Sequence, residues 1–205
     1  MKKYLSLLLV LACLFVFTGC GKKDANKKEV SEISYELGKG VITLSVEKVD
    51  GKPKHEFTTT KPEGMNKTGS VYLETDKAII SFATSGMTYH TAVKYKEKYG
   101  EVDPTFDDYL KWKDDPDSGI KLAGSEVLEY NGRKFFRYYR REGGGGQYTY
   151  FGYNYLVGVD DVYPGSRLEM AVQYKETEFP TESKEIDDET LEIIKSIKIS
   201  AKKNN

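Results

Sequence analysis

Apolar and polar residues alternate along much of the chain after residue 40, and this pattern predicts β-strands. Val41–Val49, Ser70–Thr75 and Ala78–Thr84 are three such runs. A two-residue period sends successive side chains to opposite faces of a strand. The pairs Asp50-Gly51 and Asp76-Lys77 follow two of these runs and predict hairpin turns there.

The second half of the chain predicts a longer set of strands. Ile120–Tyr130 and Arg133–Arg141 flank Asn131-Gly132, the turn pair most typical of a two-residue hairpin. Gln147–Val159 and Arg167–Lys175 continue the strand pattern. These runs favour a mainly antiparallel sheet.

Aromatic residues occur at both parities of the central strand. Phe135 and Tyr139 belong to one face, and Phe136 and Tyr138 belong to the other. Both faces of the sheet are therefore expected to be covered. The run Gly143–Gly146 that follows is expected to be a mobile turn rather than regular structure.

Two segments have helical spacing. The first is expected to begin at Asp103, with Pro104 in its first helical position, and to end at Asp114–Pro116. The second is expected to begin at Asp187, with two acidic residues in its first turn. Thr88–Tyr95 fits either a strand or a helix, because its periodicity does not separate the two.

Together these elements predict an α+β fold, with a central antiparallel sheet and about two flanking helices. No repeat or second linker divides the chain, so residues 33–201 are expected to form a single domain and residues 202–205 a disordered tail.

The N-terminus has the pattern of a secretory signal. Lys2 and Lys3 precede a thirteen-residue apolar run, Leu5–Phe17, which is shorter than the roughly 20 residues that span a membrane. Thr18, Gly19 and Cys20 follow. This end resembles the lipobox of bacterial lipoproteins, although Phe17 replaces the usual leucine at its first position.

The resemblance implies that residues 1–19 are a signal peptide and that Cys20 becomes the acylated first residue. Residues 20–32 would then be a flexible, lysine-containing tether that holds the protein at the extracytoplasmic face of the cell membrane. Because Cys13 leaves with the signal, the mature domain would contain neither a free thiol nor a disulfide. Losing Lys2 and Lys3 changes the formal net charge from −1 to −3, which disfavours nucleic acid as a partner.

A second resemblance covers roughly residues 54–200. Pro62-Glu63-Gly64, a short helix over Thr105–Lys113, the Asn-Gly hairpin and the closing run Leu191–Ile199 occur in the order found in the PsbP-like superfamily. The resemblance implies an antiparallel sheet flanked by helices and a binding or assembly role. It carries over no functional residue, because that superfamily shares no catalytic motif.

Few residues suggest catalysis. The histidines are His55 and His90, no Gly-x-Ser-x-Gly elbow occurs, and no zinc-ligand spacing is present, so no cofactor or metal is expected. Gly143–Gly146 lacks the Lys-Ser/Thr that a phosphate loop requires. The acidic run Asp114–Asp117 invites a calcium hypothesis, but a solvated turn is favoured because Gly119 does not have the position that an EF-hand requires.

The aromatic hairpin carries most of the functional signal. Tyrosine and arginine dominate binding hot spots, because they combine large rigid surfaces with polar groups. The candidate binding residues are Arg137, Arg140, Arg141, Tyr148 and Tyr150. Packing of the hairpin aromatics in a two-sided core is the competing interpretation, and it is the favoured one for most of them.

These observations predict a non-enzymatic, lipid-anchored protein that binds a partner protein or a component of the cell envelope. An extracytoplasmic hydrolase of wall or polysaccharide substrates is the alternative, since acidic residues are plentiful. A transporter-associated receptor is a third class, disfavoured by the short folded length.

The lipid anchor is directly testable. Cys20→Ala should release the protein into the medium or block its processing, because no thiol would remain to accept the lipid. Cell fractionation and mass spectrometry of the N-terminal peptide provide the measurement. Normal processing together with unchanged membrane retention of the variant would contradict the prediction.

Overall fold

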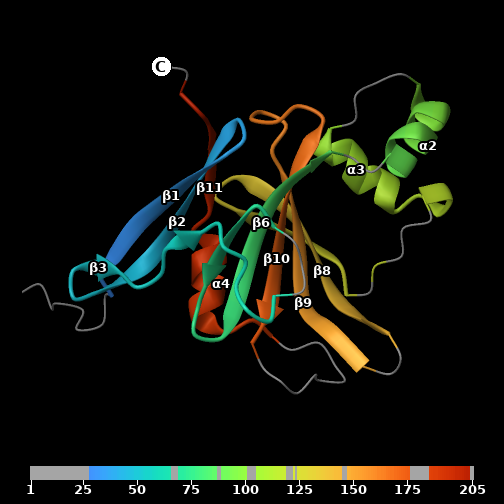
Figure 1. The fold of residues 1–205 in the computed structure, drawn as a ribbon. Helices are drawn as coiled ribbons and strands as arrows, with labels where there is room; N and C mark the ends of the chain where they lie inside the picture. The colour runs from blue at the N-terminus through green and yellow to red at the C-terminus, as the bar shows by residue number, and fades with distance from the viewer. Residues whose placement is uncertain are drawn as a thin grey trace, which may run out of the picture.

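The computed structural model describes residues 28–65, 69–86, 89–100, 105–118, 122, 124–144, 147–175 and 185–203, except for the side chains at 89–92, 140–144 and 147–151. Two antiparallel sheets and three α-helices make up this part of the chain (Figure 1). No helix among the described residues is long and apolar enough to cross a membrane.

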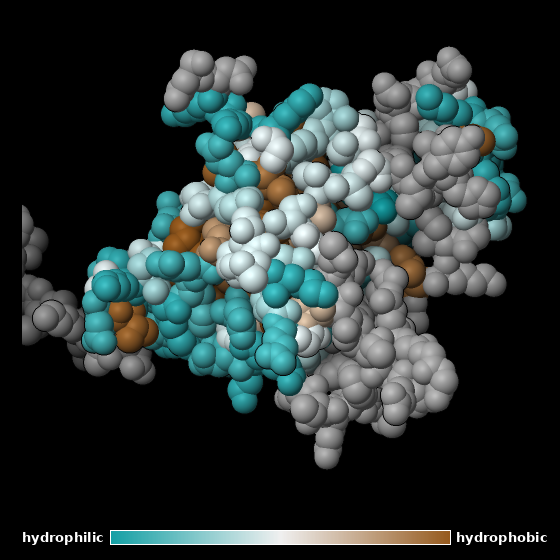
Figure 2. All heavy atoms as spheres, viewed as in Figure 1, coloured by the Kyte–Doolittle hydropathy of each residue, from teal (hydrophilic) through white to brown (hydrophobic). Residues whose placement is uncertain are grey.

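The smaller sheet has the strand order β1-β2-β11, formed by Val30–Leu37, Gly40–Val49 and Lys198–Ala201. A short strand β3, Lys52–Pro53, folds back onto the end of β2. Asp50 and Gly51 make this turn with φ angles of 52° and 76°, the positive values that a two-residue hairpin needs. At this end of the molecule, Figure 2 shows exposed apolar atoms among hydrophilic ones.

The larger sheet has seven strands in the order β4-β5-β6-β10-β9-β8-β7. In chain order these are β4 Phe57–Thr58, β5 Val71–Glu74, β6 Ala78–Gly86, β7 Glu126–Tyr130, β8 Arg133–Gly144, β9 Gln147–Gly158 and β10 Ser166–Tyr174. Every neighbouring pair is antiparallel. Asn131 and Gly132 form the β7–β8 turn with φ angles of 49° and 73°, as the sequence predicts.

The helices are α2 (Tyr89–Tyr99), α3 (Phe106–Lys113) and α4 (Asp188–Lys195), and a 3₁₀ turn occupies Pro116–Ser118. The predicted cap of α4 is confirmed, because the Asp187 side chain accepts a hydrogen bond from Thr190 N.

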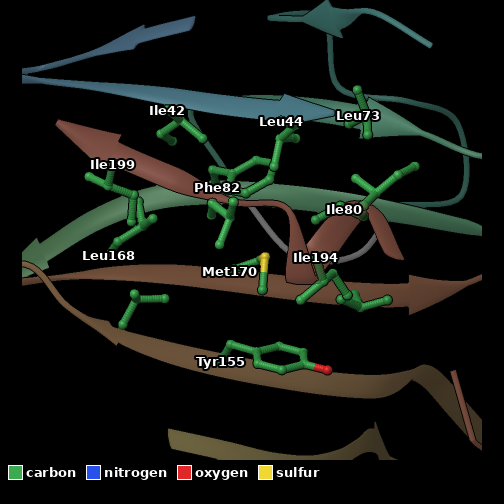
Figure 3. Close-up of a cluster of buried hydrophobic side chains, with 14 of the residues drawn as sticks. Ile42, Leu44, Leu73, Ile80, Phe82, Tyr155, Leu168, Met170, Ile194 and Ile199 are labelled. Atoms are coloured by element: carbon green, nitrogen blue, oxygen red, sulfur yellow. The ribbon is translucent and has the colours of Figure 1, made fainter. Parts of the chain in front are cut away.

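The main core lies between the two sheets. Alternate residues of β6, β9 and β10 face β2, β11 and α4, and they form one apolar layer (Figure 3). The side chains drawn together there include Ile42, Leu44, Leu73, Ile80, Phe82, Tyr155, Leu168, Met170, Ile194 and Ile199, most of them with almost no exposed surface. Burying each aliphatic side chain contributes about 1.5–3 kcal/mol, so this layer supplies most of the stabilisation.

Helix α3 covers part of the opposite face of the larger sheet, which we call the outer face. Phe106 and Tyr109 pack there against Phe136 of β8 and Leu156 of β9. Both faces of the larger sheet are therefore covered. Phe135 packs in the main core and Phe136 packs against α3, so the two residues lie on opposite faces as the sequence predicts. The expected single central sheet is wrong, because β1, β2 and β11 form a sheet of their own.

The segment Thr88–Tyr95, which the sequence left open between strand and helix, contains the start of α2. Three local predictions differ from the structure. The cap of α3 is Thr105, whose side chain forms a capping box with Asp108, rather than Asp103. Gly143 and Gly144 belong to β8 beside a bulge, because they continue the pairing with β9. Strand β1 starts at Val30, inside the segment predicted to be a tether, because its backbone pairs with β2.

Arg133 links the two sheets. Its guanidinium donates to Gly158 O (3.0 Å) beside the larger sheet and to Ile199 O (2.7 Å) in β11. It also forms a two-pronged ion pair with Asp161 at 2.7 and 2.8 Å. This pair lowers the pKa of Asp161, so its stabilisation is present at neutral pH and disappears as the pH falls through that lowered value.

We expect Arg133→Ala to lower the free energy of unfolding by about 2–3 kcal/mol, because two backbone carbonyls lose a charged donor. Urea unfolding of the variant and the parent measures this difference. Lys134→Ala is the matched control, since its partner Asp107 is exposed and such pairs are worth about 1 kcal/mol or less. Equal losses in both variants would contradict a linking role.

Candidate functional site

The outer face carries a band of small and polar residues across its three central strands. The register of β6, β10 and β9 aligns these residues in rows. The rows are Ser81–Ala171–Asn154, Ala83–Glu169–Leu156 and Ser85–Arg167–Gly158. We call this band the trough, because glycine, alanine and serine residues occupy five of its nine positions while bulkier apolar clusters stand on both sides.

Two apolar clusters flank the trough. Met65, Tyr72 and Ile79 pack together on the β5 side, and Phe106 and Tyr109 of α3 stand on the β8 side. A cavity of about 10 Å³ remains on the floor, beside Ser81, Ala83, Asn154, Glu169 and their neighbours. This is about the room that one buried water needs.

Arg167, Glu169 and Ser85 form a hydrogen-bonded network at one end of the trough. Arg167 donates to Glu169 Oε1 from Nη2 (3.0 Å) and to Ser85 Oγ from Nε (3.1 Å). The Ser85 hydroxyl donates to the same carboxylate oxygen at 2.9 Å. Arg167 is only 9% exposed, so its charge requires this compensation.

The Tyr109 ring packs over the Arg167 side chain of this network. The Arg167 guanidinium carbon lies 5.5 Å from the centroid of the tyrosine ring, a cation–π distance. Burial raises the pKa of Tyr109 to about 12, so its hydroxyl is protonated at neutral pH. The site therefore offers a neutral phenol, a cation and a carboxylate side by side.

Amides lie at the other end of the trough. Asn154 donates from Nδ2 to the Tyr138 hydroxyl at 3.0 Å, and Gln173 donates to Gly64 O at 2.6 Å. Both amide side chains are buried. Buried amides, a hydroxyl and an ion pair between aromatic walls provide both donors and acceptors, which suits recognition of a polar ligand.

Arg137, a predicted site residue, does not belong to the trough. It lies on the core side of β8, where its guanidinium carbon is 4.6 Å from the Tyr153 ring centroid. The same guanidinium forms an ion pair with Glu126. Tyr155 is its cross-strand neighbour and is completely buried. The Arg137 guanidinium interacts with the buried Tyr155 hydroxyl across this pair of strands.

The other predicted site residues are placed only by their backbones. Arg140 pairs with Gly152, Arg141 with Phe151, Tyr150 with Glu142, and Tyr148 with Gly143 across the bulge. Their side chains lie outside the described part of the chain. The hairpin site therefore stays a prediction, while the buried positions of Phe135, Phe136, Tyr153 and Tyr155 fit the core-packing interpretation.

His55 and the acidic turn have structural partners, while the side chain of His90 is outside the described residues. His55 is buried and its Nε2 lies 3.0 Å from Glu189 Oε1 at the start of α4. In the acidic turn, Lys98 bridges Asp115 and Asp117 at 2.7 and 2.9 Å, and Lys113 pairs with Asp114. No group of three or more potential metal ligands occurs in the described ranges.

A larger hollow of about 420 Å³ lies beside α2 and α3 and is lined by Lys94, Glu97, Lys98, Trp112 and Asp117. Its central cation, Lys98, is already engaged by two carboxylates. The trough is the stronger candidate, because its polar groups are buried and converge from three strands.

Sequence reasoning missed Arg167, Glu169 and Ser85 as site residues. The available signal was the parity of Arg167, Glu169 and Gln173, which share one face of a strand whose remaining residues up to Tyr174 are mostly apolar. In a sheet covered on both faces, such residues must find partners, so this spacing marks a polar cluster.

Comparisons of this chain with family models, curated proteins and solved structures give no match. The lipobox and PsbP-like resemblances therefore stay predictions. The function has to be argued from the geometry of the chain itself.

Burial also raises the pKa of Tyr155 and Tyr174 above the ordinary range, so the folded protein holds these phenolic protons more tightly than the unfolded chain does. Stability should be intact below about pH 10, the unfolded value, and decline as the pH rises further. Phenolate absorbance should therefore appear in two steps, the second together with loss of the circular dichroism of the sheet. Tyr155→Phe should reduce the amplitude of the second step, and a single step without unfolding would contradict the prediction.

Proposed function

We propose that this chain is a lipid-anchored, non-enzymatic binding protein of the extracytoplasmic membrane face, and that its trough recognises a partner protein or an envelope component. The observation that carries the proposal is the Ser85–Arg167–Glu169 network, set into a covered sheet face beneath Tyr109. A charged network is costly to bury, and ligand recognition gives a reason to keep it there.

Several features support binding over hydrolysis. Glycoside hydrolysis uses two carboxyl groups on opposite sides of the scissile bond. In the described part of the trough, Glu169 is the only carboxylate, and Arg167 already holds it in an ion pair. The same groups suit hydrogen bonding to peptide amides or sugar hydroxyls.

The PsbP-like resemblance implies an antiparallel sheet flanked by helices. The larger sheet, with α4 on its core side and α3 on its outer face, supports proposing a fold of that kind. We propose a single α+β domain of that type, with the smaller sheet as an addition. An accessory role in assembly would fit a protein held at the membrane by Cys20.

The proposal is tested by immobilising the mature chain, residues 20–205, and measuring retention of solubilised envelope proteins and of purified wall polymer from the producing bacterium. Glu169→Gln should weaken retention about 10- to 100-fold, because one charge-assisted hydrogen bond is worth about 1.5–3 kcal/mol. Glu129→Gln, at an exposed position of β7, should change nothing.

Two outcomes would redirect the assignment. Loss of retention in Arg140→Ala but not in Glu169→Gln would place the site at the β8–β9 hairpin. Release of soluble fragments from wall polymer by the parent protein would favour the hydrolase. Thermal unfolding of each variant separates lost binding from lost folding.

A further inference from the structure

Lys28 and Glu29, which fall inside the segment predicted to be a tether, attach the chain to the smaller sheet. Lys28 pairs with Glu47 at 2.9 Å, and Lys48 pairs with Glu29 at 2.6 Å. The backbone N–H of Lys48 also donates to Glu29 O at 2.8 Å. These contacts lie at the end of the smaller sheet that carries the β2–β3 turn.

Two exposed valines lie at this same end. Val30 and Val49 are 58% and 48% exposed. Val30 pairs with Glu47, so Val49, two residues further along β2, is its diagonal neighbour on the same face. That face points away from the core, because Ile42, Leu44 and Val46 occupy the inward positions of β2.

Two lysines lie beside the valine pair. Lys52 pairs directly with Val49, and Lys28 pairs with Glu47, the cross-strand partner of Val30. Lysine side chains can lay their methylene stems against apolar surface while their ammonium groups reach polar headgroups. Glu47 and Asp50 balance these two charges, so attraction to a membrane here depends on the valines and on the tether, where Lys22, Lys23 and Lys27 outnumber Asp24.

The reach of the tether restricts what this end can meet. Seven residues lie between Cys20 and Lys28, and the fully extended chain from one to the other spans about 30 Å. A lipid on Cys20 would thus hold the start of β1, and with it the valine pair, within about 30 Å of the headgroups.

We propose that the Val30–Val49 end of the smaller sheet docks onto the lipid bilayer that carries the anchor. The inference rests on the proposed lipidation of Cys20, and it adds a defined orientation to it. Figure 1 places α2 and α3 on the opposite side of the molecule from β3, so docking directs these helices away from the membrane.

The test supplies the anchor chemically. Cys20 is the only cysteine of the mature chain, so coupling it to a maleimide lipid attaches the protein to phosphatidylcholine–phosphatidylglycerol vesicles at the proposed position. Val49→Trp reports contact through quenching by brominated acyl chains. Val127→Trp is the matched control, because Val127 is 49% exposed on the far edge strand β7.

Quenching of Val49→Trp should exceed that of Val127→Trp at least threefold, and equal quenching would overturn the proposal. The unsubstituted anchored protein gives a second measurement that introduces no aromatic residue. Hydrogen exchange of the Asp50–Lys52 turn should slow at least threefold on vesicles relative to the Cys20→Ala chain, which remains in solution. Unchanged exchange would also overturn the proposal. Neither result depends on native lipidation or on the trough, which the Cys20→Ala fractionation and the Glu169→Gln binding experiment test separately.

Discussion

Burial of one apolar layer between the two sheets is the constraint on which the other features of this molecule depend. Strands alternate their side chains, so turning Leu168, Met170 and Val172 toward α4 and β2 sends Arg167, Glu169 and Gln173 to the outer face. A one-residue slip in β10 would bury the charges in the core. Burial of the apolar layer therefore determines the register of β10. That register places the residues of the trough side by side on the outer face.

The outer face then determines how α3 packs. Gly158 leaves space for this helix, because a Cβ at that position would lie 2.8 Å from the Phe106 ring. The short side chain lets Phe106 and Tyr109 approach the sheet, and Tyr109 consequently covers Arg167. Low exposure strengthens the electrostatics of the network beneath, since less water screens it. Packing and recognition chemistry thus share the same residues.

No disulfide is expected in the mature domain, so long-range hydrogen bonds complement the core. Arg133 joins the two sheets, Tyr163 OH accepts from Gly40 N at 2.7 Å, and Asn131 donates to Lys195 O and Ile197 O at the end of α4. These bonds satisfy backbone groups at loops and strand ends, where unpaired polar atoms would otherwise be costly. They fix the smaller sheet, which carries the proposed membrane contact, to the domain that contains the trough.

Local elements of this protein can be read from short stretches of its sequence. Asp50-Gly51 and Asn131-Gly132 predict their hairpins and Asp187 predicts the start of α4, because turn and cap chemistry acts over two to four residues. The long-range pairings emerge only in the folded chain: β11 joins β2 across about 150 residues to form a second sheet, and Ser85 meets Arg167 and Glu169. Such pairings depend on which apolar surfaces bury each other, and the periodicity of a strand identifies its two faces without naming the partner of either.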